Sequence, residues 1–371
     1  METGFDQRKM NDPYSKDGNV GTQRSRRPSE KESSQKEDVL MDTKTNFLRT
    51  LSVLVAAILL SCVLIQILTS VAIDPYLHAT NRYVNYFDFY ANNKEENKIY
   101  FIGSSFVEYG VNASEVERAM NYSYKAYNLG ISADTKNRVV ELDSLLKSNP
   151  KIVVYGVSYN SFYNDSFVEQ FPNLKNRIGF VTDRVKLDPY SLQLFNSTER
   201  SLIQQNYLYL LAYKRYLLIP SLKMTLASRL NIKYDTPQDF SFKEWNFPEL
   251  IICNYTREQF KNHVYKAFRA DNNNKKAFRH IVESMNEQGI HVIIVNMPLN
   301  PNCSFWISNE SRRNYLDLVA NVGCPYHDLE ALCSPMEFKD HGHANSLGKL
   351  NITNKMVEIL KTEVQNASQQ H

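Results

Sequence analysis

The chain has 371 residues, of which 43% are apolar, and this is enough to bury one substantial core. Its formal net charge of +3 is spread along the chain without a basic cluster of the kind that neutralises phosphates, which excludes nucleic acid as the expected partner. Once the non-globular ends are set aside, a single domain of ordinary size remains, so several catalytic domains are also excluded.

The N-terminal part of the sequence predicts a disordered cytoplasmic tail and one membrane span. Residues 1–45 are rich in Ser, Lys, Arg, Glu and Asp, and they bury too little surface to offset the entropy lost on folding. From Leu51 to Ile73 the chain is almost wholly apolar, and these 23 residues at about 1.5 Å each span a bilayer core. We place the transmembrane helix at residues 46–73. A buried globular helix and a cleaved signal peptide are the alternatives, and the lengths of tail and span disfavour both.

Charges beside the span predict its orientation. Basic residues precede it closely, at Lys31, Lys36, Lys44 and Arg49, whereas only Arg82 lies within the twenty residues that follow. This asymmetry places the N-terminus in the cytoplasm and the rest of the chain outside. Nine Asn-x-Ser/Thr sequons fit an exported domain, as in a glycoprotein. They begin at Asn112, Asn121, Asn164, Asn196, Asn254, Asn302, Asn309, Asn351 and Asn366.

The cysteines are compatible with an oxidising compartment. One of the five, Cys62, lies in the span, and the other four permit two disulfides in three connectivities. Cys324 with Cys333 is the preferred pair because the loop between them is short. Four reduced, buried thiols are the alternative, and the spacing is poor for zinc.

The region after the span predicts a short stalk and then an α/β domain. Residues 74–97 are rich in Tyr, Phe and Asn, a composition typical of an interfacial belt and stalk. Over residues 98–362 strands and helices alternate, which predicts a parallel sheet with helices on both faces, and residues 363–371 form a C-terminal tail. The expected strands lie at 98–102, 124–128, 151–156, 291–296 and 326–329, and the expected helices at 113–120, 135–148, before 288, 310–322 and 346–364.

A largely helical insertion, residues 160–271, interrupts this alternation. It contains Leu202 to Leu230, an apolar and tyrosine-rich stretch broken by Pro220. An insertion of this size at the carboxyl end of a strand usually shapes a substrate cleft. Its aromatic residues could bind sugars or acyl chains or lie on the membrane surface, but packing on the core is the favoured interpretation. The tyrosines concerned are Tyr207, Tyr209, Tyr213 and Tyr216.

A serine follows directly on the first expected strand of the domain. The run Lys98–Ile102 ends in Gly103-Ser104-Ser105, so that a hydroxyl lies at the carboxyl end of the strand. In open α/β sheets this end of the strands is where ligands bind, and the helix at 113–120 would begin beside the same crevice. A plain turn is the alternative, because Gly and Ser are common turn residues.

A second polar motif, Asp340-His341-Gly342-His343, lies in a loop just before the last helix. A hydroxyl is a poor nucleophile until a positioned base removes its proton, and a carboxylate best holds that base in the correct tautomer. Ser105, His343 and Asp340 are therefore the candidate nucleophile, base and orienting acid of a catalytic triad. His341 is a rival base, and a metal-dependent enzyme using His341, His343 and Asp340 is a less favoured alternative. We expect neither a metal nor a cofactor.

At these residues the chain resembles the SGNH (GDSL-type) hydrolase superfamily, whose members carry four short sequence blocks on a flavodoxin-like sheet. Phe101–Phe106 matches the first block, with Ser105 in the nucleophile position and Ser104 replacing the usual Asp. Asp340 and His343 match the fourth block, with an Asn and a Gly behind them at the family's spacing. The Gly-Ser-Ser form is similar to the membrane-anchored, extracytoplasmic branch that includes D-alanyl transfer proteins and alginate O-acetylation proteins.

The resemblance implies further residues of the site. The second block is matched by Tyr127–Ser132, and the backbone amide of Gly130 would form the oxyanion hole together with that of Ser105. Phe305 and Trp306, which follow the strand at 291–296, are expected to form a wall of the substrate-binding crevice.

The third block departs from the family pattern. The pattern Gly-x-Asn-Asp aligns with Gly156-Val157-Ser158-Tyr159, so Ser158 or Asn160 would have to supply the side-chain donor of the oxyanion hole. The resemblance implies an esterase or O-acyltransferase that acts on ester-linked acyl groups of cell-surface polysaccharide or lipid. A transferase would need a membrane partner that brings the acyl donor across. The altered block motivates the alternative of an inactive SGNH scaffold that binds or assembles envelope components.

Overall fold

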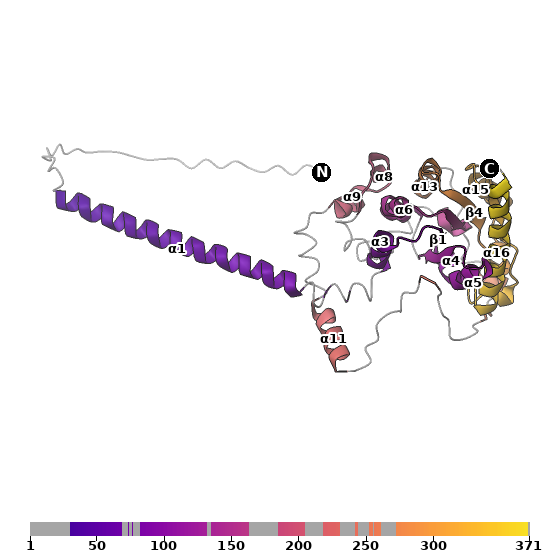
Figure 1. Cartoon of the computed structure of the whole chain (residues 1–371), viewed down its shortest axis with the longest axis horizontal. Coiled ribbons are helices and arrows are strands. Elements are labelled where there is room, and N and C mark those ends of the chain that lie inside the picture. Colours follow the sequence, from indigo (N-terminus) through magenta and orange to yellow (C-terminus); the bar gives the residue numbers. More distant parts are fainter. Residues whose placement is uncertain are drawn as a thin grey trace, which may run out of the picture. The chain divides into compact units, whose positions relative to one another are not determined.

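The structure is a computed structural model that divides into two units, Met1–Gln66 and Ile67–His371 (Figure 1). The described residues are 30–68, 73, 76, 82–131, 135–162, 185–204, 218–230, 242–243, 252–254, 256–260 and 272–369.

The first unit contains one long helix, α1 (Glu30–Leu68). Within it, Met41–Ile67 is long and apolar enough to cross a membrane, judged by length and composition. The hydroxyls of Ser52 and Ser61 each donate to the backbone carbonyl four residues earlier at 2.8 Å, so these polar groups are satisfied without water.

The boundaries of this helix differ from the predicted ones. It begins at Glu30, inside the segment predicted to be disordered, and it ends at Leu68, before the predicted end of the span at Ile73. Ile73 is only 4% exposed and belongs to the hydrophobic core of the second unit. Residues 69–72 of the predicted span at 46–73 lie outside the described residues, so the C-terminal end of the span stays a prediction.

The second unit is built on a five-stranded sheet in the order β2-β1-β3-β4-β5, in which every neighbouring pair is parallel. The strands are β1 (Lys98–Gly103), β2 (Lys125–Gly130), β3 (Ile152–Val157), β4 (His291–Asn296) and β5 (Tyr326–Asp328). Strands β1 and β3 are buried along their whole length, as expected for a sheet covered on both faces. The predicted flavodoxin-like α/β fold is confirmed.

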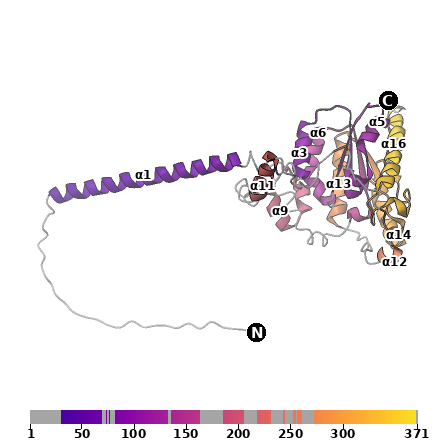
Figure 2. The same cartoon turned by 90° about the horizontal axis from the view of Figure 1, so that it is seen from below.

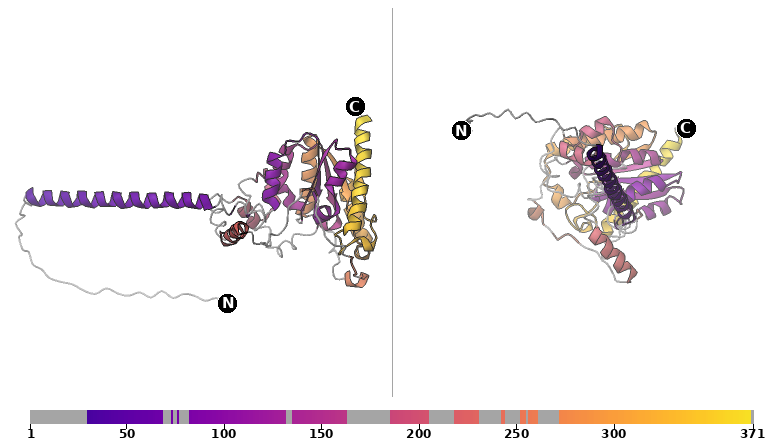
Figure 3. Two further views of the ribbon diagram at one scale, coloured as in Figure 1. Left: turned by 60° about the horizontal axis from the view of Figure 1, so that its bottom comes forward. Right: turned by 90° about the vertical axis from the view of Figure 1, so that its left-hand side faces the viewer.

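Helices cover both faces of the sheet (Figures 2 and 3). On one side lie α3 (Arg82–Asn92), α6 (Leu142–Ser148) and α13 (Asn273–Glu287), and on the other lie α5 (Ala113–Ala119) and α16 (Ser346–Gln369). The remaining elements of the α/β part are α4 (Ser105–Gly110), the 3-10 helices η2 (Thr135–Glu141), η3 (Tyr159–Phe162) and η7 (Pro335–Glu337), α14 (Pro301–Ser304) and α15 (Asn309–Ala320). Helix α16 continues through most of the predicted C-terminal tail.

The predicted juxtamembrane stalk at 74–97 is wrong. Helix α3 lies in this segment and turns Tyr83, Tyr86, Phe87 and Tyr90 into the core. These four residues follow the spacing of one helix face, and this periodicity is a stronger indicator of structure than the tyrosine-rich composition on which the stalk prediction relied.

Four α-helices lie in the described parts of the insertion. They are α8 (Pro189–Gln193), α9 (Ser197–Ile203), α11 (Leu218–Arg229) and α12 (Arg257–Phe260). The four tyrosines predicted to pack on the core, Tyr207, Tyr209, Tyr213 and Tyr216, lie outside the described residues.

All five cysteines are free thiols, so the predicted Cys324–Cys333 disulfide is not formed. Cys333 is buried, and burial raises the pKa of its thiol to about 12. Burial also raises the pKa of Cys324. Both thiols are therefore held in the protonated, less reactive form.

Candidate active site

Ser105 is the first residue of helix α4, directly beyond the carboxyl end of β1. The chain turns from strand to helix at Gly103, whose φ of +146° is rare for residues with a side chain. A Cβ at Gly103 would also lie 2.2 Å from the carbonyl oxygen of Gly156 on the neighbouring strand. Ser104 caps the helix, its Oγ accepting a hydrogen bond from the amide of Phe106 at 3.4 Å. The glycine and the cap together fix where the Ser105 hydroxyl emerges.

His343 and Asp340 lie in a short loop that several hydrogen bonds hold in shape. Phe338 and Ala344 form an isolated antiparallel bridge across it, and the amide of Lys339 donates to the carbonyl of His343 at 3.0 Å. Asn345, which belongs to the fourth sequence block, then begins α16, because its Oδ1 accepts from two amides of the first turn at 3.0 and 3.2 Å. This side chain explains why an Asn follows the histidine.

The loop brings the three predicted triad side chains together. His343 Nε2 lies 2.7 Å from Ser105 Oγ, and His343 Nδ1 lies 2.8 Å from Asp340 Oδ2. With the carboxylate accepting from Nδ1, Nε2 is the ring nitrogen that can accept the proton of the serine. Residues 238 positions apart in sequence thus form the relay that general-base activation of a hydroxyl requires.

The environment of Asp340 keeps its carboxyl ionised. Burial alone would raise its pKa, but the hydrogen bond and the charge of His343, together with the amides of Gly342 and His343, hold the pKa well below its ordinary value. Both amides donate to Oδ1, at 3.0 and 2.8 Å, which leaves Oδ2 for the imidazole. The orientation of the carboxylate is therefore fixed by backbone amides, independently of the imidazole ring of His343.

Aromatic rings fix the plane of the histidine. The centroids of Phe106 and Tyr109, both on α4, lie 5.3 and 5.0 Å from that of His343 in edge-to-face contacts. Lys339 Nζ lies 3.9 Å from the centre of the Tyr109 ring. Burial lowers the pKa of Lys339, and the nearby charges of Asp340 and Glu108 offset part of this. Sequence inspection missed this packing, although Phe106 and Tyr109 are one and four residues beyond Ser105 on the same helix.

A buried ion pair lies behind the nucleophile strand. The guanidinium of Arg138 donates to the carbonyls of Gly103 and Leu129, each at 2.5 Å, and pairs with Glu141. Tyr90 Oη donates to the same glutamate at 3.3 Å. The carbonyl ends of β1 and β2 are thereby held at fixed positions directly before the turn that carries Ser105. Sequence analysis did not find this network, because its partners come from four separate elements.

The amide of Gly130 donates to Oδ1 of Asn128 at 2.9 Å. A Cβ at Gly130 would lie 2.3 Å from the amide nitrogen of Glu108, so the residue is a glycine because α4 packs tightly against the end of β2. The role of the Gly130 amide in the oxyanion hole stays a prediction.

Ser158 and Asn160 were the other predicted oxyanion donors. Ser158 follows β3, next to β1 in the sheet, and its Oγ is fully buried without a hydrogen-bond partner. Its own amide donates to Ser161 Oγ at 3.0 Å. The side chain of Asn160 lies outside the described residues. The backbone amides of Ser105 and Gly130 and the side chains of Ser158 and Asn160 all stay predicted donors.

The predicted wall residues lie at the end of α14. Phe305 is 57% exposed and packs edge-to-face on Trp306, with the guanidinium of Arg257 4.3 Å from the centre of the Phe305 ring. Trp306 Nε1 donates to the backbone carbonyl of Arg257 at 2.8 Å. This segment is tied to the triad loop, since Asn300 Nδ2 donates to the carbonyl of Asp340 at 3.1 Å. A role of Phe305 and Trp306 in substrate binding stays a prediction.

The rival histidine is placed differently from His343. His341 Nδ1 lies 3.8 Å from Asp340 Oδ1, beyond hydrogen-bond distance, and that oxygen already accepts two amides. Within the part of the chain that the structure describes, no three His, Cys, Asp or Glu side chains are grouped as metal ligands. The geometry therefore favours His343 as the base.

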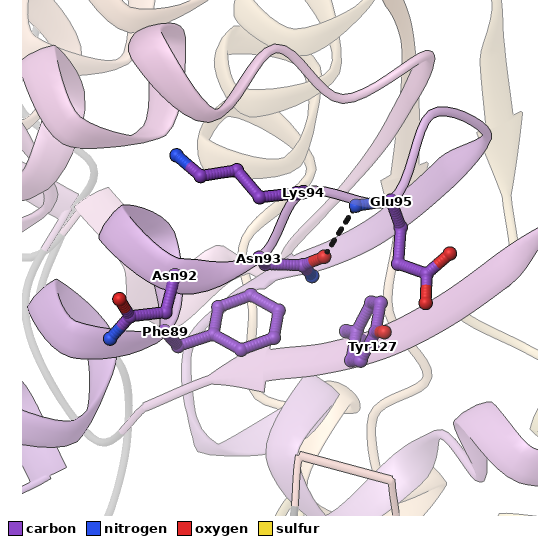
Figure 4. A pocket seen from close by; sticks show the side chains of 6 residues that line it. All are labelled: Phe89, Asn92, Asn93, Lys94, Glu95 and Tyr127. Atoms are coloured by element: carbon purple, nitrogen blue, oxygen red, sulfur yellow. Dashed lines mark hydrogen bonds between the residues drawn. The ribbon is translucent and has the colours of Figure 1, made fainter.

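A cavity of about 630 Å³ lies away from the triad (Figure 4). Its lining residues come from the end of α3, the loop before β1 and strand β2: Phe89, Asn92, Asn93, Lys94, Glu95 and Tyr127. The amide of Glu95 donates to Asn93 Oδ1 at 3.2 Å, which closes the loop that forms one side (Figure 4). Because these residues precede β1, whereas Ser105 follows it, the cavity and the triad lie at opposite ends of the strand.

No family model and no curated protein matches the chain. Solved structures do match: a Bacteroides fragilis structure described as an acylhydrolase is 12% identical with a TM-score of 0.37, and the match covers 76% of this chain and 96% of that one. A GDSL-like lipase from Bacteroides thetaiotaomicron is 10% identical with a TM-score of 0.36, covering 77% and 98%. A Streptococcus pneumonia structure described as a platelet activating factor is 11% identical with a TM-score of 0.32, covering 81% and 99%.

The observed topology agrees with the resemblance of the sequence to the SGNH hydrolase superfamily. The strand order 2-1-3-4-5, a serine at the carboxyl end of the first strand and an Asp-x-x-His loop before the last helix are what the sequence resemblance implies. The membrane-anchored branch within that superfamily stays a prediction.

Proposed function

We propose that this chain is a membrane-anchored serine hydrolase or O-acyltransferase that acts on ester-linked acyl groups through Ser105, His343 and Asp340. The observation that carries the proposal is the continuous relay of 2.7 and 2.8 Å from the serine hydroxyl through both ring nitrogens to the carboxylate. A serine in an ordinary turn would not be expected to contact an imidazole that a half-buried carboxylate orients.

The chemistry follows from this geometry. His343 Nε2 takes the proton of Ser105, and Oγ attacks the ester carbonyl carbon, whose oxygen gains the negative charge. His343 then returns the proton to the departing alcohol, which leaves an acyl-serine. Water or an acceptor hydroxyl, deprotonated by the same nitrogen, releases the acyl group and restores the enzyme.

Two donors would stabilise the oxyanion. The amide of Ser105 lies at the start of α4, and the buried hydroxyl of Ser158 has no acceptor of its own. Each such donor contributes about 3 kcal/mol in comparable sites. We therefore expect Ser158→Ala to lower kcat by about 100-fold, with little change in KM, if its hydroxyl faces the oxyanion.

The substrates are proposed from compartment and anchoring. A chain with a span-length helix and the predicted extracytoplasmic orientation meets O-acyl groups on cell-surface polysaccharide or lipid. An acyltransferase would need a membrane partner that supplies the acyl donor. Adding an acceptor sugar to an assay with an activated acetate ester separates the activities, because transfer yields acylated sugar and hydrolysis yields free acid.

A serine-reactive fluorophosphonate tests the proposal. The wild-type chain should be labelled and Ser105→Ala should not. Ser104→Ala is the matched control, since its hydroxyl is one residue away and accepts the Phe106 amide instead of contacting His343. Equal labelling of wild type and Ser105→Ala, or no labelling of either, would instead support an inactive scaffold that binds or assembles envelope components.

A further inference from the structure

Helix α11 turns its aliphatic side chains outward. Three of them, together with the leucine that directly follows the helix, form one stripe with exposed fractions of 67%, 39%, 58% and 66%: Ile219, Leu222, Leu226 and Leu230. Their spacing of three, four and four residues places them on one side of a helix. The side that is covered carries small residues, with Ser221 fully buried and Ala227 8% exposed. This is the reverse of the arrangement that a helix of a water-soluble domain adopts.

Basic residues flank this aliphatic stripe. Lys223 and Arg229 are both exposed, and the helix contains no acidic residue. The sequence around it has the same bias, because between Arg200 and Asp235 it holds five basic residues and no acidic one. Exposed aliphatic groups beside lysine and arginine match the boundary between acyl chains and anionic headgroups of a lipid bilayer.

The chain itself keeps the second unit close to a bilayer. The candidate span ends at Ile67, and Ile73 is already part of the core of the second unit. Six residues reach at most about 20 Å when fully extended. A domain on so short a connection stays at the membrane surface, where an aliphatic patch is exposed to lipid at high local concentration.

A second copy of the chain is a poorer occupant of the stripe. The helix has 12 residues and is about 18 Å long, so a face about 10 Å wide offers about 180 Å². Stable protein interfaces bury about 800 Å² on each partner. The stripe is too small for a dimer interface but sufficient for a shallow lipid contact that supplements an anchor.

We propose that α11 is an interfacial helix whose aliphatic stripe lies in the headgroup and acyl-chain boundary of the bilayer that holds α1. The inference goes beyond the proposed chemistry and rests only on the membrane anchoring. The contact of α11 with the bilayer gives the domain a second attachment point, which restricts the rotation of the domain above the membrane.

The experiment uses the full chain in vesicles of phosphatidylcholine and phosphatidylglycerol. Leu226→Trp places a reporter on the stripe, and Leu350→Trp is the matched control, since Leu350 on α16 is 56% exposed and Leu226 is 58% exposed. The emission of the native Trp245 and Trp306 is subtracted by using the wild-type chain. Lipid brominated along the acyl chains should quench the added emission of Leu226→Trp by at least about 2-fold and leave that of Leu350→Trp unchanged.

The outcomes separate docking from anchoring. Equal quenching of the two reporters overturns the docking of α11. If the emission of Leu226→Trp shifts with the number of protein molecules per vesicle but is not quenched by brominated lipid, a second copy of the chain occupies the stripe. This outcome also overturns the docking of α11 in the bilayer. Carbonate extraction tests only whether α1 anchors the chain in the membrane. Release of the wild-type chain would show that this anchoring, on which the inference rests, is absent. Retention of the chain without quenching would refute the docking of α11 but not the anchoring by α1. Fluorophosphonate labelling, measured in parallel, shows whether the proposed chemistry holds in either case.

Discussion

Replacing Asp340 by Asn tests the role of the triad carboxylate, whose two oxygens are both held by hydrogen bonds. Oδ1 of residue 340 accepts the amides of Gly342 and His343, so an Asn would keep its oxygen there and turn its NH₂ group toward His343 Nδ1. In the opposite orientation, the NH₂ group of the Asn would face two backbone N–H donors. Both hydrogen bonds from these donors, each worth about 1 kcal/mol, would then be lost. The imidazole would then accept at Nδ1 and carry its proton on Nε2, facing Ser105.

A base with the wrong tautomer cannot accept the serine proton. We expect kcat to fall by about 10⁴-fold, or about 5 kcal/mol, while KM changes little, because the substrate still binds in the same cleft. The assay is steady-state hydrolysis of an activated acetate ester by the full chain in detergent, with circular dichroism to confirm folding. The loss should shrink as pH rises, since hydroxide can replace the missing base.

His341→Ala is the matched control for this substitution. Its ring also lies beside Asp340, but at 3.8 Å and without a place in the relay, so we expect less than about 10-fold change. The reasoning is refuted if Asp340→Asn keeps more than a tenth of wild-type kcat/KM, or if His341→Ala loses as much activity as Asp340→Asn.

Three further outcomes follow from the site. Gly130→Ala should destabilise the domain by about 1–3 kcal/mol in urea unfolding, because its Cβ would lie 2.3 Å from the Glu108 amide. Arg138→Met leaves Glu141 buried without its guanidinium partner, which should cost about 3–5 kcal/mol in the same measurement, and an unchanged midpoint would contradict a stabilising role of the ion pair. The pKa of Asp340 is depressed, so its contribution to stability is complete above about pH 4 and is lost as pH falls further, and acid unfolding of Asp340→Asn should lack this component.

The sheet could be predicted because its strands are covered on both faces. A strand buried on both sides is a continuous apolar run, and β4 has the predicted bounds while β1 extends one residue further, to Gly103. Helix α4 could not be predicted in this way, because six residues contain too little of a helical period to be recognised. Ser104, a good N-cap residue directly before an apolar run, was the available signal.

The residues that surround the triad are harder to predict than the triad itself. The chemistry of serine, histidine and aspartate follows from their residue types. The spacing of the sequence blocks then limits which of these residues are candidates for the triad. Arg138, by contrast, acts by donating to the carbonyls of Gly103 and Leu129, and carbonyl acceptors are the same in every residue. Its partners are defined only once β1 and β2 lie side by side.

The oxyanion hole shows the same limit most clearly. A glycine after β2 is compatible with two roles, an amide donor to substrate or a site of close packing, and sequence does not distinguish them. The structure shows the packing role, because the Gly130 amide donates to Asn128 and its missing Cβ makes room for Glu108. A buried hydroxyl without an acceptor, as at Ser158, is the kind of group that a developing negative charge would satisfy. The altered third block therefore predicts a hydroxyl in place of the family's side-chain amide, and Ser158→Ala measures whether that hydroxyl acts in catalysis.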